Sequence, residues 1–107
     1  MMLKKQFLKS KPVCKVTFRL AAAACDAADS VKLVGDFNEW NVEEAVEMKS
    51  LKKGGFKTVL NLEIGKNYEF RYLIDGETWE NDWEADLYTP NEFGTENSVV
   101  VLAAAVA

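Results

Sequence analysis

The chain has 107 residues, a formal net charge of −4 and 49% apolar residues, the balance of a soluble globular domain rather than of a disordered chain. The negative charge argues against a general affinity for nucleic acid or for an anionic membrane. The sequence contains no histidine, which excludes Ser-His-Asp and Cys-His catalysis and removes the commonest metal ligand. We therefore predict a single domain over residues 1–107, with its core in residues 13–102, no metal site and no cofactor.

The amino-terminal residues are basic and lack the apolar core of a signal peptide, so we expect a cytoplasmic location. They predict an arm or an edge strand that ends near Pro12. From Val13 to Leu20, apolar and polar residues alternate, as in a strand with one buried face. Cys14 lies on the apolar face of this strand and is expected to be a small core residue rather than a reactive thiol.

A turn with a tryptophan behind it follows the next strand. Residues 21–30 are rich in alanine but interrupted by polar residues, so we expect a loop with one helical turn at most. Val31–Val34 is a short β-type run that leads into GDFN, a group of turn formers around one aromatic residue. Trp40 comes next. A tryptophan in this position either closes the end of a sandwich core or forms a flat platform for a ligand.

Short strands continue through the middle of the chain. Residues 41–53 predict a loop with a short strand, and Phe56–Leu62 is another β-rich run that ends before Gly65. Tyr68–Ile74 is the clearest strand in the sequence. Its aromatic residues alternate with Glu69 and Arg71, so the aromatic residues are expected to face the core.

Asp75-Gly76 predicts a hairpin after that strand, and two registers are open. A two-residue turn would place Trp79 on the core face. A three-residue loop with a bulge would pair Leu73 with Trp79, on the face that carries Arg71. The second register is favoured because it keeps Glu77 out of the ladder.

The last part of the chain contains a long segment of turn formers and a final strand. Residues 81–97 are rich in asparagine, aspartate, proline and glycine, and an ordered loop of this length without secondary structure of its own is usually functional. The β-branched residues within positions 98–102 indicate the final strand. Short strands at regular spacing, with little helix, predict an all-β fold, an antiparallel β-sandwich of about seven strands.

Four blocks of the sequence carry a resemblance to a known family. They are VKLVGDFNEWN, then Met48, then GGFKTVLNLEIGKNYEFRYLIDGETWEND, then YTPNEFGTENSVV. In this order they resemble carbohydrate-binding module family 48, the glycogen-binding or isoamylase N-terminal early set domain of glycogen branching enzymes and of the AMP-activated protein kinase β subunit. The resemblance covers residues 13–102 and implies an immunoglobulin-like sandwich that binds α-1,4-linked glucans.

The resemblance also implies a sugar site. In the kinase-type members, two tryptophans, a basic residue and a loop near the carboxyl end bind the glucan. The corresponding residues of this chain are Trp40, Arg71, Trp79, Phe93, Thr95 and Asn97. Indole rings can cover the apolar face of a glucose unit, and guanidinium, hydroxyl and amide groups can bind its hydroxyls.

The same residues also fit structural roles. A tryptophan in a small sandwich can belong to the core, and Asn97 can satisfy backbone groups of its own turn. Arg71 can pair with Glu69 or Glu80 at the surface, where an ion pair contributes little stability. Six acidic residues lack the cleft of a glycosidase and the spacing of a calcium loop, so we interpret them as a solvated face: Glu43, Glu44, Glu47, Asp82, Glu84 and Asp86.

We expect a non-catalytic module that recognises α-1,4-linked glucans such as glycogen or starch through a tryptophan platform, either alone or accessory to a glycoside hydrolase or branching enzyme. The alternative is a protein-interaction or accessory domain of an α-glucan-metabolising enzyme, without sugar binding of its own. Its partner would be a glycogen-metabolising enzyme or a second copy of the chain. Trp83 and the alanine-rich residues 103–107 motivate this alternative. No nucleic acid and no membrane partner is expected.

Overall fold

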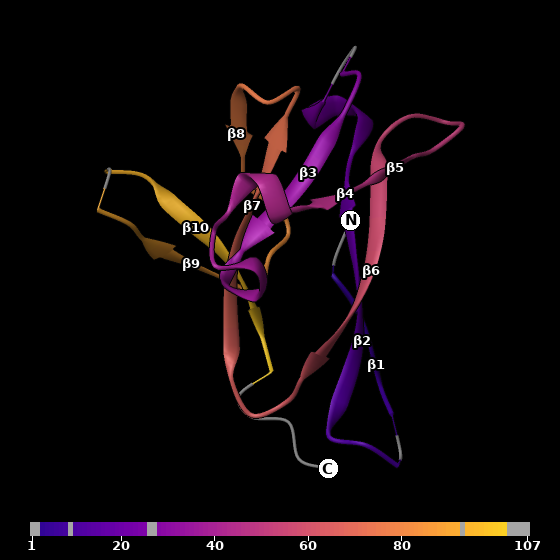
Figure 1. The fold of residues 1–107 in the computed structure, drawn as a ribbon, viewed down its shortest axis with the longest axis vertical. Coiled ribbons are helices and arrows are strands. Elements are labelled where there is room, and N and C mark those ends of the chain that lie inside the picture. Colours follow the sequence, from indigo (N-terminus) through magenta and orange to yellow (C-terminus); the bar gives the residue numbers. More distant parts are fainter. Residues whose placement is uncertain (1–2, 9, 26–27, 93, 103–107) are drawn as a thin grey trace.

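The computed structural model describes residues 3–8, 10–25, 28–92 and 94–102, in which two antiparallel sheets form a sandwich (Figure 1). The first sheet contains, in spatial order, β1 (Lys4–Phe7), β2 (Val13–Leu20), β6 (Phe56–Glu63) and β5 (Lys49–Ser50). The second contains β4 (Val46–Glu47), β3 (Val31–Gly35), β7 (Asn67–Ile74), β10 (Glu96–Val101) and β9 (Leu87–Pro90), and β8 (Thr78–Glu80) also pairs with β7. The all-β prediction is confirmed.

Three short 3-10 turns complete the regular structure of the described residues: η1 (Ala22–Ala24), η2 (Asp36–Asn38) and η3 (Val42–Glu44). The first matches the single helical turn predicted in the alanine-rich segment. Nowhere in the described ranges is there a helix with the length and apolar character that crossing a bilayer requires.

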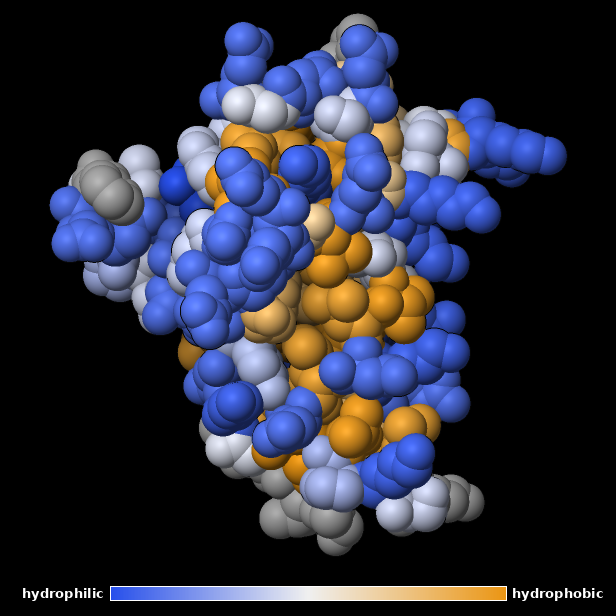
Figure 2. Space-filling view, in the orientation of Figure 1, coloured by the Kyte–Doolittle hydropathy of each residue, from blue (hydrophilic) through white to orange (hydrophobic). Residues whose placement is uncertain are grey.

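The core lies between the sheets and is built on the alternation of β2 and β7. Cys14 is fully buried, as predicted, and so are Phe18 and Phe70, whose rings meet edge to face with centroids 5.0 Å apart. Tyr72 extends this aromatic stack at 5.7 Å from Phe70. Such an aromatic pair contributes about 0.5–1.5 kcal/mol to stability beyond the contribution of the apolar area that the two rings bury. On the side seen in Figure 2, apolar side chains reach the surface between the two sheets.

A second buried layer lies on the outer face of the second sheet. The residues next to Val34, Leu73 and Val99 in β3, β7 and β10 face the core, so these three side chains point to the opposite face of the sheet. They are nevertheless buried. Ladder pairing places Val34 beside Arg71 and Leu73 beside Trp79. Val34 and Leu73 therefore lie on the same face of the sheet as Arg71 and Trp79. This face is therefore covered by other parts of the chain and is not an open, flat surface.

The β7–β8 hairpin has the favoured register, because Leu73 pairs with Trp79. Asp75 and Gly76 have φ angles of 52° and 71°, the left-handed conformation that a tight hairpin turn requires. Ile74 pairs with Thr78, which leaves Glu77 as the extra residue outside the ladder. The prediction that Trp79 shares the face of Arg71 is confirmed.

The predicted loop 81–97 needs a correction, because it contains the strand β9. Leu87–Pro90 pairs with β10 and forms an edge of the second sheet. Leucine, tyrosine and threonine favour strands, and a proline at the end of an edge strand removes no ladder bond that the sheet needs. Turn-forming residues precede and follow this short strand, which is why the sequence pattern predicted a continuous loop.

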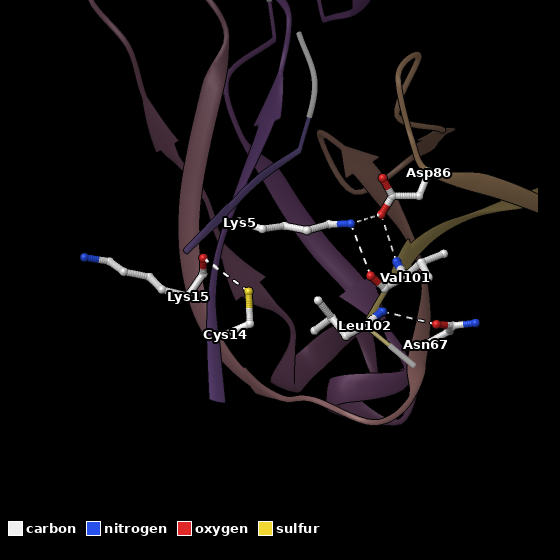
Figure 3. Close-up of polar contacts among 7 residues, drawn as sticks. All are labelled: Lys5, Cys14, Lys15, Asn67, Asp86, Val101 and Leu102. Carbon is white, nitrogen blue, oxygen red and sulfur yellow. Dashed lines mark hydrogen bonds and ion pairs between the residues drawn. The ribbon is translucent and has the colours of Figure 1, made fainter. Parts of the chain in front are cut away.

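An ion pair joins the edge of the first sheet to the second sheet (Figure 3). The Lys5 Nζ atom lies 2.6 Å from Oδ2 of Asp86 and donates a hydrogen bond to the Val101 carbonyl at 3.1 Å. The same Asp86 oxygen accepts from the Val101 amide at 2.8 Å. The basic amino-terminal segment is thus an edge strand, as predicted, and Lys15 of the neighbouring strand points to the other side (Figure 3).

Candidate functional site

A cavity of about 920 Å³ opens beside the outer face of β7. Its lining residues are Trp40, Arg71, Trp79, Asn91, Glu92, Thr95 and Asn97. In the view of Figure 1, the turns that follow β3 lie below β8 and to the right of the β9–β10 hairpin. These elements and β7 carry the lining residues. Five of the six predicted site residues therefore meet at one cavity, and the sixth, Phe93, lies outside the described residues.

Asp36 holds the Trp40 ring in place. The indole Nε1 of Trp40 donates to Oδ1 of Asp36 at 3.0 Å, and the backbone amide of Glu69 donates to Oδ2 at 2.7 Å. One carboxylate therefore links the ring to strand β7. Because the indole N–H is already bonded, the ring can offer a ligand its faces rather than a donor.

The backbone of this turn is constrained from several directions. Glu39 and Trp40 have φ angles of 54° and 58°, a left-handed conformation that costs an L-residue on the order of 1 kcal/mol or more. The Asn38 side chain accepts from the Gly35 amide and donates to the Leu33 carbonyl, both at 3.0 Å. The Trp40 amide donates to the Gly35 carbonyl at 2.9 Å. These bonds keep Trp40 partly exposed beside the sheet rather than inside the core.

Trp79 and Arg71 form the second part of the cavity wall. Trp79 lies on β8 and is 39% exposed, and Arg71 Cζ lies 5.6 Å from the centre of its ring. Within the described ranges no carboxylate pairs with Arg71, and its buried Nε has no hydrogen-bond partner. The alternative role of Arg71, a surface pair with Glu69 or Glu80, is absent there, and the guanidinium charge lies beside the ring and the cavity.

The third part of the wall is a chain of side-chain hydrogen bonds across three strands. Oε1 of Glu69 accepts from Thr89 Oγ1 at 2.7 Å and from Asn97 Nδ2 at 3.1 Å. Oδ1 of Asn97 accepts from Asn91 Nδ2 at 3.1 Å, and Asn91 Nδ2 also lies 2.8 Å from Thr95 Oγ1. Asn97 is thus oriented by side chains rather than by its own turn, and its amide keeps one further donor and one further acceptor for a ligand.

Sequence reasoning missed three contributors to this site. Asn91 and Glu92 line the cavity, and Glu69 orients Asn97 from the neighbouring strand. An asparagine four residues before a threonine in a turn was a usable signal for Asn91, whose Oδ1 accepts from the Thr95 amide at 3.2 Å. Trp83 is 58% exposed and is not among the lining residues, so it stays without a role at this site.

The chemistry of the cavity is that of a binding surface. Two aromatic rings, one cation and several amide and hydroxyl groups converge there. No group of three histidine, cysteine, aspartate or glutamate side chains within the described ranges is placed to hold a metal ion. The arrangement can cover an apolar surface and bind hydroxyl groups around it.

Comparison with known proteins supports this interpretation. No match was found among curated protein sequences. A family model, the glycogen recognition site of AMP-activated protein kinase, matches residues 25–106 and so includes every residue that lines the cavity. The chain therefore belongs to the family of the glycogen recognition site of AMP-activated protein kinase, a carbohydrate-binding module of the family 48 type, as the resemblance predicted.

Proposed function

We propose that the chain is a non-catalytic module that binds α-1,4-linked glucans, such as glycogen or starch, in the cavity between Trp40, Trp79 and Asn97. The single observation that carries this proposal is the meeting of the two tryptophans, the arginine and the oriented amides at one cavity in a chain of this family. The rings come from segments far apart in the sequence, and a shared structural role in the core does not explain their partial exposure.

Each part of the wall fits a different part of a sugar chain. Glucose has an apolar face of C–H bonds, which the rings of Trp40 and Trp79 can cover. Its hydroxyls can accept from Arg71 and can both donate to and accept from the amide of Asn97. An α-1,4-linked chain is curved, so successive units can turn one face toward each ring. The cavity is open to solvent, and we expect a Kd in the micromolar to millimolar range.

The test is substitution of Trp40 by alanine. We expect Trp40→Ala to lose about 1–3 kcal/mol of binding free energy, because a rigid aromatic surface is removed from the cavity wall. Electrophoresis in a native gel that contains glycogen measures this as loss of retardation, and circular dichroism verifies the fold. Trp83→Ala is the matched control, since it removes an exposed tryptophan outside the cavity. Equal mobility of the wild-type chain with and without glycogen would contradict the proposal.

The linkage preference is tested separately by competition. Maltoheptaose should displace glycogen, and a cellulose oligosaccharide of the same length should not, because an extended β-1,4 chain lacks the curvature that turns successive units of an α-1,4 chain toward the two rings. If both sugars displaced glycogen equally, the chain would bind sugars without the proposed α-1,4 preference.

A further inference from the structure

The outward side of the first sheet is unusually basic for an acidic chain. Alternation within the strands turns Cys14, Val16 and Phe18 toward the core, so the residues between them point outward. The basic residues at outward positions are Lys4, Lys15, Arg19, Lys49 and Lys57, together termed the basic face. Hydrophilic side chains project along the side where β5 and β6 lie (Figure 2), and Lys15 points away from the core cysteine beside it (Figure 3).

Several of these charges lie directly beside one another. Ladder pairing places Arg19 beside Lys57 and Lys57 beside Lys49, so three cations form a row across three strands. Neighbouring strands are about 5 Å apart, and like charges at opposed positions destabilise a sheet. No carboxylate in the described residues pairs with any member of this row. The arrangement costs stability as it stands, and an anionic partner would relieve that cost.

The outward positions also restrict the kind of partner. Within the described strands of this sheet they contain no aromatic residue, and Val13 and Val59 are the apolar residues among them. Peripheral membrane binding combines cations with inserted apolar side chains, and single-stranded nucleic acid binding relies on aromatic stacking. A sheet face also lacks a protruding element that could enter a groove of duplex DNA.

We propose that the basic face binds an acidic segment of a partner protein. Lys15 and Arg19 are four residues apart on one strand, and Lys57 and Lys49 continue the row from Arg19 across the sheet. Acidic side chains four residues apart on an extended segment recur at about 13 Å, which matches the spacing of Lys15 and Arg19 along β2. The interaction needs charge and strand spacing alone, and the face supplies both.

The basic face and the glucan cavity lie on opposite sheets. The cavity is beside the outward residues of β7 and β10, in the second sheet, and the basic face belongs to β1, β2, β5 and β6. A partner on the basic face therefore leaves the cavity accessible. In this arrangement the module joins a glucan to an acidic protein, and the protein contact does not depend on sugar binding.

The test uses fluorescently labelled poly-L-glutamate and the full chain, with binding followed by anisotropy at low and at physiological salt. The variant Lys15→Glu/Lys57→Glu reverses two charges of the basic face. The matched control Lys11→Glu/Lys66→Glu changes the net charge equally at exposed positions outside the strands that form that face. We expect at least about a tenfold loss of polyglutamate affinity in the first variant, less than about twofold in the control, and weaker binding of the wild type at higher salt.

Two further measurements separate the proposal from its rivals. Lys15→Gln/Lys57→Gln should also lose polyglutamate affinity but should raise the Tm, because it removes repulsion without adding negative charge. Retardation by glycogen should stay unchanged in all three variants. Equal losses in the basic-face and control variants would show an effect of net charge alone. Tighter binding of the wild type to phosphatidylserine vesicles or to single-stranded DNA than to polyglutamate would overturn the assignment of the partner.

Discussion

Two aspartates that lie near the tryptophans of the cavity in the sequence have opposite environments in the structure. Asp36 is exposed and touches the Trp40 ring directly, while its second oxygen accepts from the backbone of β7. Asp82, three residues after Trp79, is only 3% exposed, and its hydrogen bonds in the described residues go to the core and to its own loop rather than to the Trp79 side chain. It accepts from the Tyr72 hydroxyl and from the Glu84 amide, both at 2.8 Å.

This difference separates the site from the scaffold. The bonds of Asp36 orient a ring that faces the cavity, so we expect its loss to affect the ligand more than the fold. The bonds of Asp82 fix the chain behind β8 to the core, and its own amide donates to the buried hydroxyl of Ser98 at 2.8 Å. Its loss should therefore affect the fold first and the position of Trp79 only as a consequence.

The largest expected effect is that of Asp82→Ala, which should lower the free energy of unfolding by about 3 kcal/mol. The substitution leaves the hydroxyl of Tyr72 buried without an acceptor and removes the bond to the Glu84 amide. Urea denaturation followed by tryptophan fluorescence measures the change. Asp36→Ala is the comparison, with an expected loss of about 1 kcal/mol at an exposed position. Equal losses of unfolding free energy in the two variants would show that Asp82 is no more important to the fold than Asp36.

The pH dependence of the same site gives a second readout. Burial raises the pKa of the Asp82 carboxyl above its ordinary value, although the bond from Tyr72 lowers it. The folded state thus favours the protonated carboxyl, whose contribution to stability is complete below about pH 4 and is lost as the pH rises through the raised pKa. Asp82→Asn stays neutral, so its stability relative to the wild type should increase from pH 3 to pH 7. A constant difference would show that Asp82 does not titrate in this way.

The next effect concerns the ligand. We expect Asp36→Ala to weaken maltoheptaose binding about tenfold, because the Trp40 ring loses its bond and must be ordered when the sugar binds. Isothermal titration calorimetry measures the affinity, and the double variant Asp36→Ala/Trp40→Ala tests the mechanism. If Asp36 acts through the ring, the double variant should bind no more weakly than Trp40→Ala alone. Additive losses would show that Asp36 contributes in another way.

Local patterns in the sequence predicted the parts of this comparison that depend on neighbouring residues. Alternation placed Cys14 and Phe70 in the core. The GDFN turn left Trp40 open between a core position and a ligand platform, and the structure shows it partly exposed. The register of Trp79 followed from keeping Glu77 out of the ladder. The family resemblance, rather than any spacing, brought Arg71, Thr95 and Asn97 into the same site as the two rings.

Features that depend on strands distant in sequence were not predictable in this way. The bond from Asn97 to Glu69 requires the β7–β10 pairing, and the burial of Asp82 requires Tyr72 and Ser98 to meet behind β8. In the sequence, Asp82 is indistinguishable from the acidic residues around it, and the prediction that it belongs to a solvated face is wrong, because it is buried. A carboxylate becomes a core residue only when the fold supplies donors to it. For Asp82 these donors are the Tyr72 hydroxyl of β7 and the nearby Glu84 amide, while Ser98 of β10 accepts from the Asp82 amide.

The smallest effect tests the backbone of the Trp40 anchor. Glu39 has φ 54° and ψ 31°, a left-handed conformation in which glycine carries no steric penalty. We therefore expect Glu39→Gly to raise the free energy of unfolding by about 0.5–1 kcal/mol in urea denaturation, with maltoheptaose affinity unchanged. Glu43→Gly is the matched control, since Glu43 lies in η3 without a positive φ and should lose about as much as Glu39→Gly gains. Destabilisation by both substitutions would mean that the bonds of Asp36 and Asn38, rather than backbone strain, decide the stability of this turn.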